Sequence, residues 1–206
     1  MKFHWYAIIL VIVCVIVFFL QIMYDFITDE FSLVSAELFS RPWVLVTHIF
    51  LHGSFEHLFY NMFALGLFGS ILEKIIGGEK FLFIFFASGI VAGLGSFLFY
   101  EASLGASGAI MGILGTLGVL RPRMTVYVSY VPMPMSVAVI FWALGDLLGF
   151  FVPFTNVAHI AHLAGLATGL LYGWKLKEKY GRSYPRKVRY REIGEREFRN
   201  WEDGWM

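Results

Sequence analysis

Long runs of apolar residues, interrupted by charges and turn residues, fill most of the chain up to about residue 176. A helix of about 20 apolar residues is long enough to cross the hydrocarbon core of a bilayer. We therefore predict an all-α polytopic membrane protein with six transmembrane helices. The predicted spans are residues 3–24, 57–76, 80–100, 107–120, 133–152 and 158–176.

The composition supports a bilayer as the solvent for this chain. Hydrophobic residues make up 58% of its 206 residues and charged residues only 15%, far from the balance of a soluble domain. The first apolar segment is longer than a signal-peptide core and is followed by Asp25 and Phe26 instead of a small-residue cleavage site, so we expect it to be retained. The single cysteine, Cys14, excludes an intramolecular disulfide.

The basic residues predict the orientation of the spans. With the N-terminus in the cytosol, every one of the 16 Lys and Arg residues except Arg41 flanks a span on the cytosolic side, as the positive-inside rule requires. Both termini are then cytosolic. The chain divides into a six-helix core (1–177), which includes an outer loop at about 25–56, and a mixed-charge cytosolic tail (178–206). The outer loop either rests partly on the lipid or is an ordinary solvated loop.

Three polar residues share one depth in spans that run from the outside to the cytosol. Asn61, Ser107 and His162 each precede a basic residue at the cytosolic end of the span by 13 or 14 positions. At 1.5 Å per residue, they lie roughly 20 Å above the cytosolic face and about 10 Å below the outer surface. Polar side chains at such a depth are costly unless paired, so they are candidates for a functional site.

Glycine spacing predicts how these residues meet. Small residues four positions apart let membrane helices pack closely, and such stripes begin beside Ser107 and at His162. They comprise Gly108, Gly112 and Gly115 in one span and Gly165, Gly169 and Gly173 in the other. We expect the two stripes to pack together and bring Ser107 next to His162. Helix packing without chemistry is the alternative interpretation.

The residue types suit nucleophilic catalysis. A serine hydroxyl becomes a nucleophile when a neighbouring imidazole removes its proton, which makes Ser107 the candidate nucleophile and His162 the candidate base. Gly105 and Gly108 would allow a sharp backbone turn and the approach of a carbonyl carbon.

The same region offers donors for the oxyanion of a tetrahedral intermediate. A helix that begins at Ser107 leaves backbone N–H groups without partners. The side-chain amide of Asn61 is a further donor, and so is a ring N–H of His57, which lies one helical turn before Asn61. Losing one such donor commonly costs ~3 kcal/mol of transition-state stabilisation.

Three motifs, in order, resemble those of the rhomboid family of intramembrane serine proteases, and the resemblance covers nearly all of residues 40–175. The motifs are HIFLHGSFEHLFYN from His48 to Asn61, GASG from Gly105 to Gly108, and AHLAG from Ala161 to Gly165. A GxSG turn alone is a weak signal, whereas the ordered set is specific.

The resemblance implies a six-helix rhomboid bundle that needs no cofactor and no metal. It implies Ser107 as nucleophile, His162 as general base, and His57, Asn61 and the Ser107 backbone as oxyanion partners. The residues expected to support them are Gly105, Gly108, Met111 and Gly165. The implied activity is cleavage of transmembrane protein substrates within or near the outer end of a membrane helix, through an acyl-enzyme. The fifth span, with Pro132 and Pro134 at its cytosolic entrance, is the expected lateral gate.

Two positions depart from the family pattern. Family members often place an aromatic residue four positions after the serine, where it stacks on the histidine, but this chain has Met111, so a more loosely held base is expected. The outer loop commonly carries a Trp-Arg pair, whereas this chain has Arg41 before Trp43.

Histidine spacing also raises a weaker alternative, a metal site. His159 with His162, and His48 with His52, have spacings that metal ligands use, but no HExxH motif is present and no carboxylate within a span is expected beside these histidines. Asp146, toward the outer end of the fifth span, is a lesser candidate for a third member that orients His162.

Taken together, these observations predict a serine endopeptidase in the plasma membrane, with its active site opening toward the non-cytosolic side. Its partners would be transmembrane substrates and the bilayer, with no nucleic acid, and the sequence carries no signal for an oligomeric state. One alternative is a non-catalytic rhomboid-like protein that binds membrane clients. Another is a small-molecule transporter, for which paired broken helices or inverted halves would be expected.

Overall fold

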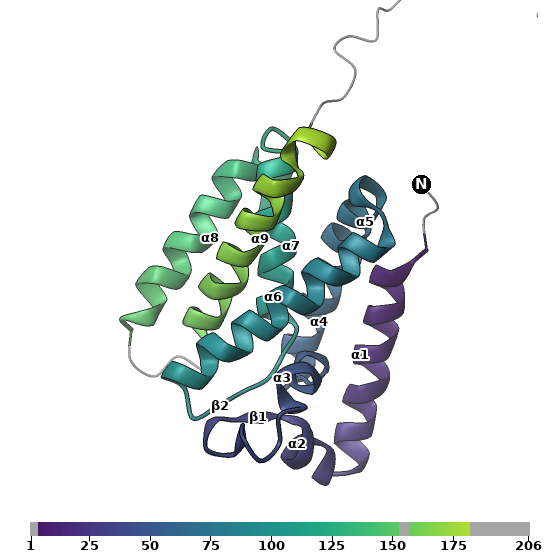
Figure 1. Ribbon diagram of the computed structural model, residues 1–206, viewed down its shortest axis with the longest axis vertical. Helices are drawn as coiled ribbons and strands as arrows, with labels where there is room; N and C mark the ends of the chain where they lie inside the picture. Colours follow the sequence, from purple (N-terminus) through teal and green to yellow (C-terminus); the bar gives the residue numbers. More distant parts are fainter. Residues whose placement is uncertain (1–3, 153–156, 182–206) are drawn as a thin grey trace, which may run out of the picture.

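The computed structural model describes residues 4–152 and 157–181, which form a helical bundle (Figure 1). Its principal helices are α1 (Tyr6–Met23), α4 (Phe55–Ala64), α5 (Ser70–Ile76), α6 (Gly78–Phe99), α7 (Ser107–Leu120), α8 (Met135–Phe150) and α9 (His159–Tyr180). A π-helical segment, η3 (Leu65–Gly69), joins α4 to α5 into one rod. The shorter elements are α2 (Phe26–Phe31), β1 (Leu33–Val34), η1 (Ser35–Glu37), α3 (Val44–Thr47), η2 (His48–Phe50), β2 (Ala102–Ser103), β3 (Thr125–Val128) and β4 (Val131–Pro134).

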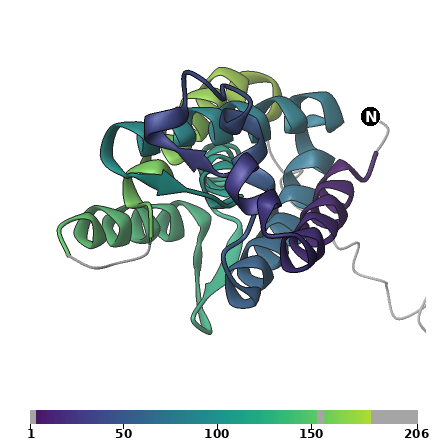
Figure 2. The ribbon, with the colours of Figure 1, turned by 90° about the horizontal axis from the view of Figure 1, so that it is seen from below.

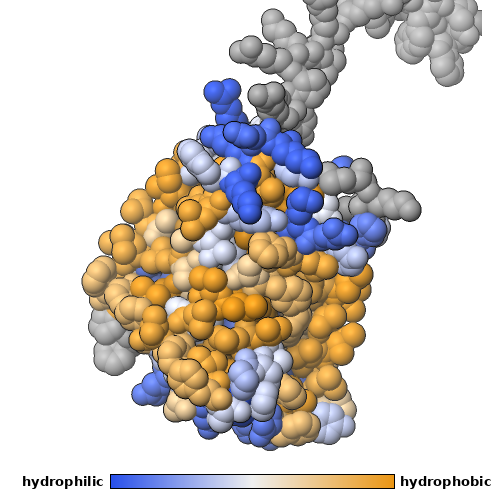
Figure 3. Space-filling view, in the orientation of Figure 1, coloured by the Kyte–Doolittle hydropathy of each residue, from blue (hydrophilic) through white to orange (hydrophobic). Residues whose placement is uncertain are grey.

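Each of the six predicted segments contains a helix. Within the described residues, α1, the rod Phe55–Ile76 and α6 are long and apolar enough to cross a bilayer, while α7 and α8 are shorter apolar helices. The face drawn in Figure 3 carries a broad hydrophobic band between two polar ends. The last helix extends to Tyr180, beyond the predicted end at 176, and most of the predicted tail (182–206) lies outside the described residues.

α7 occupies the centre of the bundle. Of its 14 residues, 11 are buried, and the view along its axis shows it surrounded by the other helices (Figure 2). It packs most extensively against α9 and then against α6. A helix that is apolar on every side is expected in such a position.

The glycine stripes meet as predicted. A Cβ atom at Gly165 would overlap the carbonyl oxygen of Gly108, and one at Gly169 would overlap that of Gly112. One turn further, the Thr116 hydroxyl donates to the carbonyl oxygen of Gly169 at 3.0 Å and to that of Gly112 at 2.9 Å. The two backbones are therefore in direct contact, which side chains larger than hydrogen would prevent.

The start of α1 is held by a buried carboxylate. Glu73, near the end of the rod formed by α4, η3 and α5, is 1% exposed. It accepts hydrogen bonds from the backbone N–H groups of His4 (3.1 Å), Tyr6 (3.2 Å) and Ala7 (3.1 Å). The first N–H groups of a helix have no partner within the helix, and a negative charge is favourable there. Glu73 therefore ties α1 to α5.

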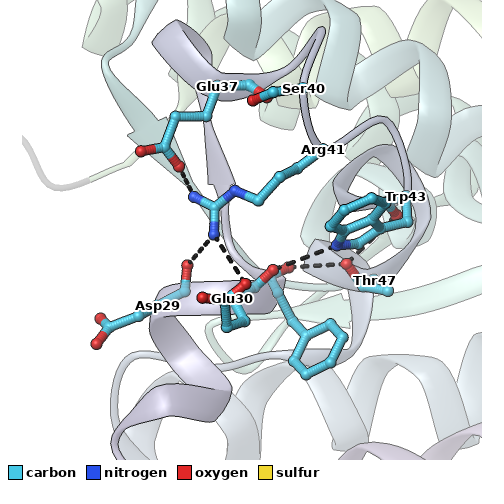
Figure 4. A network of polar contacts seen from close by, with 8 residues as sticks. Asp29, Glu30, Glu37, Ser40, Arg41, Trp43 and Thr47 are labelled. Atoms are coloured by element: carbon cyan, nitrogen blue, oxygen red, sulfur yellow. Dashed lines mark hydrogen bonds and ion pairs between the residues drawn. The ribbon is translucent and has the colours of Figure 1, made fainter.

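The loop between α1 and α4 is folded and organised by one arginine (Figure 4). Arg41 donates to the backbone carbonyl of Asp29 at 2.8 Å and pairs with the carboxylates of Glu37 and Glu30. The indole N–H of Trp43 donates to the carbonyl of Glu30 at 3.4 Å. Although Arg41 precedes Trp43 in this chain, both side chains donate hydrogen bonds to backbone carbonyl oxygens of α2.

A small core lies under this loop. Leu33, Leu38 and Val44 are buried together, with Phe97 of α6 packed against them. Phe39, in contrast, is 86% exposed. The inner face of this segment therefore packs onto α6, and contact of its outer side with lipid stays a prediction.

The entrance to the fifth span differs from the prediction. β3 and β4 pair as an antiparallel hairpin with Thr125 opposite Pro134, so α8 begins only at Met135. The turn residues Ser129 and Tyr130 have φ of 48° and 67°, the conformation of a two-residue hairpin turn that usually contains glycine or asparagine. Because neither residue is a glycine or an asparagine, the sequence does not indicate this turn.

The close contact of α7 and α9 can be tested at Gly169. Gly169→Ala should force the helices apart and lower the free energy of unfolding by about 1–3 kcal/mol, measured by thermal or denaturant unfolding in detergent micelles. Gly145→Ala in α8 is the matched control, because a Cβ there meets nothing within 4 Å. Equal stability of the two variants would contradict the account.

Candidate active site

The turn that precedes Ser107 is fixed from the outer loop. β1 pairs antiparallel with β2, so that Leu33 lies opposite Ser103. Two residues later the N–H of Gly105 donates to the carbonyl of His48 at 2.9 Å. The outer loop therefore sets the path of the chain immediately before the candidate nucleophile.

Gly105 is required by its backbone and by its neighbour. Its φ is +122°, a conformation that residues with a side chain rarely adopt. A Cβ at this position would also overlap the imidazole ring of His57. His57 thus lies directly against the turn that carries Ser107, and its role as an oxyanion donor stays a prediction.

Ser107 is the first residue of α7 and lines a small pocket. The pocket has a volume of about 20 Å³, which is enough for a water molecule. His48, Ser96 and Ser103 are polar residues of its wall. The hydroxyls of Ser96 and Ser103 are buried and have no hydrogen-bond partner among the described residues. The pocket behind Ser107 is therefore polar enough to hold water.

His48 is held in its neutral form. Its Nδ1 lies 2.7 Å from the carbonyl oxygen of Val44, to which it donates. Burial lowers the pKa of His48 to about 4, although this hydrogen bond acts in the opposite direction. His52, in the same loop, has a pKa lowered to about 4 by burial and by the neighbouring His57. Neither ring carries a charge near neutral pH.

Ser107 and His162 lie at the same level of the contact between α7 and α9. The residue after Ser107, Gly108, lies against the carbonyl of Ala161, which precedes His162. In the described part of the chain the Ser107 hydroxyl makes no hydrogen bond. The helices therefore bring the two predicted residues to one level, and no hydrogen bond joins them.

His162 has a partner that the sequence analysis treated as minor. Its Nδ1 lies 2.9 Å from Oδ1 of Asp146, and the same oxygen lies 2.8 Å from Nδ1 of His159. The expectation that no carboxylate stands beside these histidines is wrong, because α8 packs against the start of α9 with Asp146 turned inward and only 8% exposed. The available signal was the His-x-x-His spacing together with an acid near the outer end of the preceding span.

Asp146, His159 and His162 also form a group with metal-ligand character. One ligand atom from each lies within 4.8 Å of the others, and imidazole and carboxylate groups are ligands that Zn²⁺ accepts. The distances of 2.8 and 2.9 Å are those of hydrogen bonds. Two ring N–H groups donating to one carboxylate therefore account for the cluster without an ion.

The predicted oxyanion residue Asn61 is 7% exposed. Its side-chain amide donates one hydrogen to the carbonyl of His57 at 2.9 Å, which leaves the second hydrogen for a ligand. The depth inferred for Asn61 assumed an α-helix down to Lys74, but the path crosses the π-helix η3. A π-helix closes its hydrogen bonds over five residues, so Asn61 lies somewhat closer to the cytosolic end than the count implies.

Met111 is buried one turn after Ser107. A loosely held base is the expectation from the sequence, because Met111 replaces a stacking aromatic residue. In the structure the His162 ring donates a hydrogen bond to Oδ1 of Asp146, so the base has a fixed contact of another kind.

A half-buried serine at a glycine-flanked helix start and a half-buried imidazole on the facing helix lie in one bundle with helices long and apolar enough to cross a membrane. These features indicate an integral membrane protein. The Rhomboid domain profile matches residues 40–179. The chain belongs to the rhomboid family.

Individual relatives are similar over most of the chain. It is 30% identical over 145 residues to YdcA of Bacillus subtilis, covering 69% of this chain and 71% of YdcA. It is 28% identical over 174 residues to the mitochondrial Rhomboid protein 1 of Saccharomyces cerevisiae, covering 80% of this chain and 47% of that protein. It is 26% identical over 171 residues to the rhomboid protease GlpG of Yersinia pseudotuberculosis, covering 78% and 58%. The yeast and Yersinia proteins are thus substantially longer than the part that this chain matches.

The burial of His48 predicts a loss of stability in acid. The unfolded chain takes up the proton near pH 6.5, while the folded protein resists it down to about pH 4. The contribution of neutral His48 to the free energy of unfolding is therefore fully present above pH 6.5 and is lost as the pH falls toward 4. His48 alone should contribute a loss of about 2 kcal/mol between pH 7 and pH 5.

Denaturant unfolding in mixed micelles at both pH values measures this loss. His48→Gln should reduce the pH dependence, whereas the exposed His4, changed to Gln, is the matched control and should leave it unaltered. The same pH dependence in wild type and His48→Gln would show that His48 is not the buried neutral group described.

Proposed function

We propose that the protein is an intramembrane serine endopeptidase that cleaves transmembrane proteins within or near the outer end of a membrane helix. Ser107 is the nucleophile and His162 the general base. The observation that carries this proposal is the backbone contact of α7 and α9, which puts Gly108 against Ala161 and so brings Ser107 to the level of His162. Membership of the rhomboid family, in which the Yersinia relative is named a protease, supports it.

The reaction runs in two stages. The Ser107 oxygen attacks the carbonyl carbon of the scissile peptide while its proton passes to Nε2 of His162. The tetrahedral intermediate collapses, the C–N bond breaks, and the leaving amine takes that proton from His162. A water molecule then gives a proton to His162 and attacks the ester carbon. The C–O bond to Ser107 breaks, the acid is released, and His162 returns the proton to the Ser107 oxygen.

The oxyanion formed in each stage has donors close by. The backbone N–H groups at the start of α7 are free of partners within the helix. Asn61 keeps one amide hydrogen free of its bond to His57, and the His57 ring lies against Gly105. Fixed donors of this kind stabilise the developing charge without reorganisation.

The proposed topology has six spans with both termini in the cytosol, in the plasma membrane, and a site open to the non-cytosolic side. A substrate helix must unwind locally to present a peptide bond to Ser107, so small or helix-breaking residues are expected near the cut. α8 is the proposed lateral gate. It packs mainly on α9 and α7 and exposes a row of apolar residues that includes Ile140, Phe141 and Leu144.

The first test is cleavage of a reporter transmembrane substrate in liposomes. Wild type should cut it, and Ser107→Ala should reduce the rate by at least ~10³-fold, because no other hydroxyl is placed at the start of α7. Gly145→Ala, in open space on α8, controls for handling and reconstitution. Equal cleavage by wild type and Ser107→Ala would refute the assignment.

The polar pocket behind Ser107 predicts a specific effect on the second stage. Ser96→Ala removes a pocket hydroxyl that water can bind, so hydrolysis of the acyl-enzyme should slow several-fold while acylation is unchanged. Rapid quenching, with the covalent intermediate quantified by mass spectrometry, measures the two stages separately. Ser88→Ala is the matched control, since Ser88 is another buried serine of α6 whose hydroxyl has no hydrogen-bond partner among the described residues, but it does not line this pocket. Equal intermediate levels in both variants would exclude the role of the pocket.

A further inference from the structure

We propose that Asp146 and His159 are positioning residues that hold His162 in the one tautomer able to act as a base. The inference rests on the proposed function, because it assigns a role within the same site. It concerns residues on two helices: Asp146 on α8, and His159 and His162 one turn apart on α9.

The two hydrogen bonds to Oδ1 of Asp146 determine which ring nitrogen of His159 and of His162 carries the proton. An ionised carboxylate can only accept hydrogen bonds, so a ring nitrogen 2.8 or 2.9 Å from Oδ1 of Asp146 must donate. A neutral imidazole carries one N–H, and in both rings it is therefore on Nδ1. The lone pair of His162 is then on Nε2, the nitrogen that must take the proton of Ser107.

His159 holds the carboxylate from the second side. It lies three residues before His162, so both rings project from one face of α9 toward α8. On α8, Gly149 lies three residues after Asp146, and a Cβ there would overlap the His159 ring. This glycine leaves room for the ring beside the carboxylate. Asp146 thus accepts from two rings in a buried site, where each hydrogen bond is stronger than in water.

The same carboxylate acts during the reaction. When His162 takes the serine proton it becomes a cation, which a neighbouring carboxylate stabilises. The titratable groups near His162 are Asp146 from α8, His159 from its own helix and His57 from α4. Among these only Asp146 carries a negative charge, so its removal should change both the rate and its pH dependence.

The alternative role for this cluster is a polar link between α8 and α9. Such a link would affect stability and activity together and would leave the pH dependence of the reaction unaltered. The two roles are therefore separable by experiment.

The test compares four variants in the reporter-cleavage assay across pH, with thermal unfolding measured in parallel. Asp146→Asn should lower kcat at least ~10-fold with KM little changed, and should move the acidic limb of the pH–rate profile to lower pH. His159→Leu should lower kcat, and His159→Gln should restore much of it because its amide N–H can still donate to Asp146. Glu73→Gln is the matched control: it alters a buried carboxylate remote from the site, so it should lower stability and leave the pH profile unchanged.

A direct readout is the tautomer itself. In protein labelled with ¹⁵N-histidine, the ring shifts of His162, assigned by comparison with His162→Gln, should report the proton on Nδ1. A proton on Nε2 overturns the inference whether or not the enzyme is active. An Asp146→Asn variant with the kcat and the pH profile of the wild type also overturns it. So does an Asp146→Asn variant whose loss of activity is explained by its lower thermal stability, with the pH profile unchanged as in Glu73→Gln. Absence of Ser107-dependent cleavage in wild type would instead overturn the proposed function.

Discussion

The direct contact of two helix backbones is the constraint on which the rest of the structure depends. Gly165 and Gly169 of α9 lie on the carbonyl groups of Gly108 and Gly112 in α7, with no side chain between them. In a bilayer, burying apolar side chains gives little net attraction between helices, so close packing and interhelical hydrogen bonds must hold them together. The bond from Thr116 to Gly169 supplies one of these. Because both helices begin close to the contact, the two candidate catalytic residues are brought to one level.

The other elements orient side chains around this contact. From one side, the outer loop pairs with β2 and holds Gly105 through the carbonyl of His48. From another, α4 brings the His57 ring against the same glycine. From a third, α8 places Asp146 on the ring of His162. The site is thus built where four helices and a loop meet, although each contributes only one or two polar groups.

Much of this arrangement follows from periodicity in the sequence. The glycines recur every three or four residues beside Ser107 and every four from Gly165 onward, and this pattern was enough to predict which faces meet. The Gly105 turn and the one-turn spacing of His57 and Asn61 were likewise visible, because both depend on local geometry.

The features that were missed depend on relations between segments. Whether Asp146 points to lipid or to α9 depends on the rotation of α8, which its nearly uniform apolar sequence does not specify. The hairpin before α8 has Ser129 and Tyr130 at positive φ, where a glycine or asparagine would have revealed it. The π-helix η3 alters the height of Asn61, yet its residues, three apolar side chains and two glycines, carry no signal specific to a π-helix. In each case tertiary packing decides among local conformations of similar energy.

The central claim is that His162 turns Ser107 into a nucleophile, and covalent labelling tests it most directly. A fluorophosphonate probe should modify Ser107, as identified by mass spectrometry of the labelled peptide, and the rate should fall in acid as the imidazole becomes charged. His162→Ala should abolish the labelling while the protein remains folded. Labelling of Ser107 at the same rate in His162→Ala, or no labelling of Ser107 in wild type, would contradict the account, and the latter result would favour a client-binding rhomboid without catalysis.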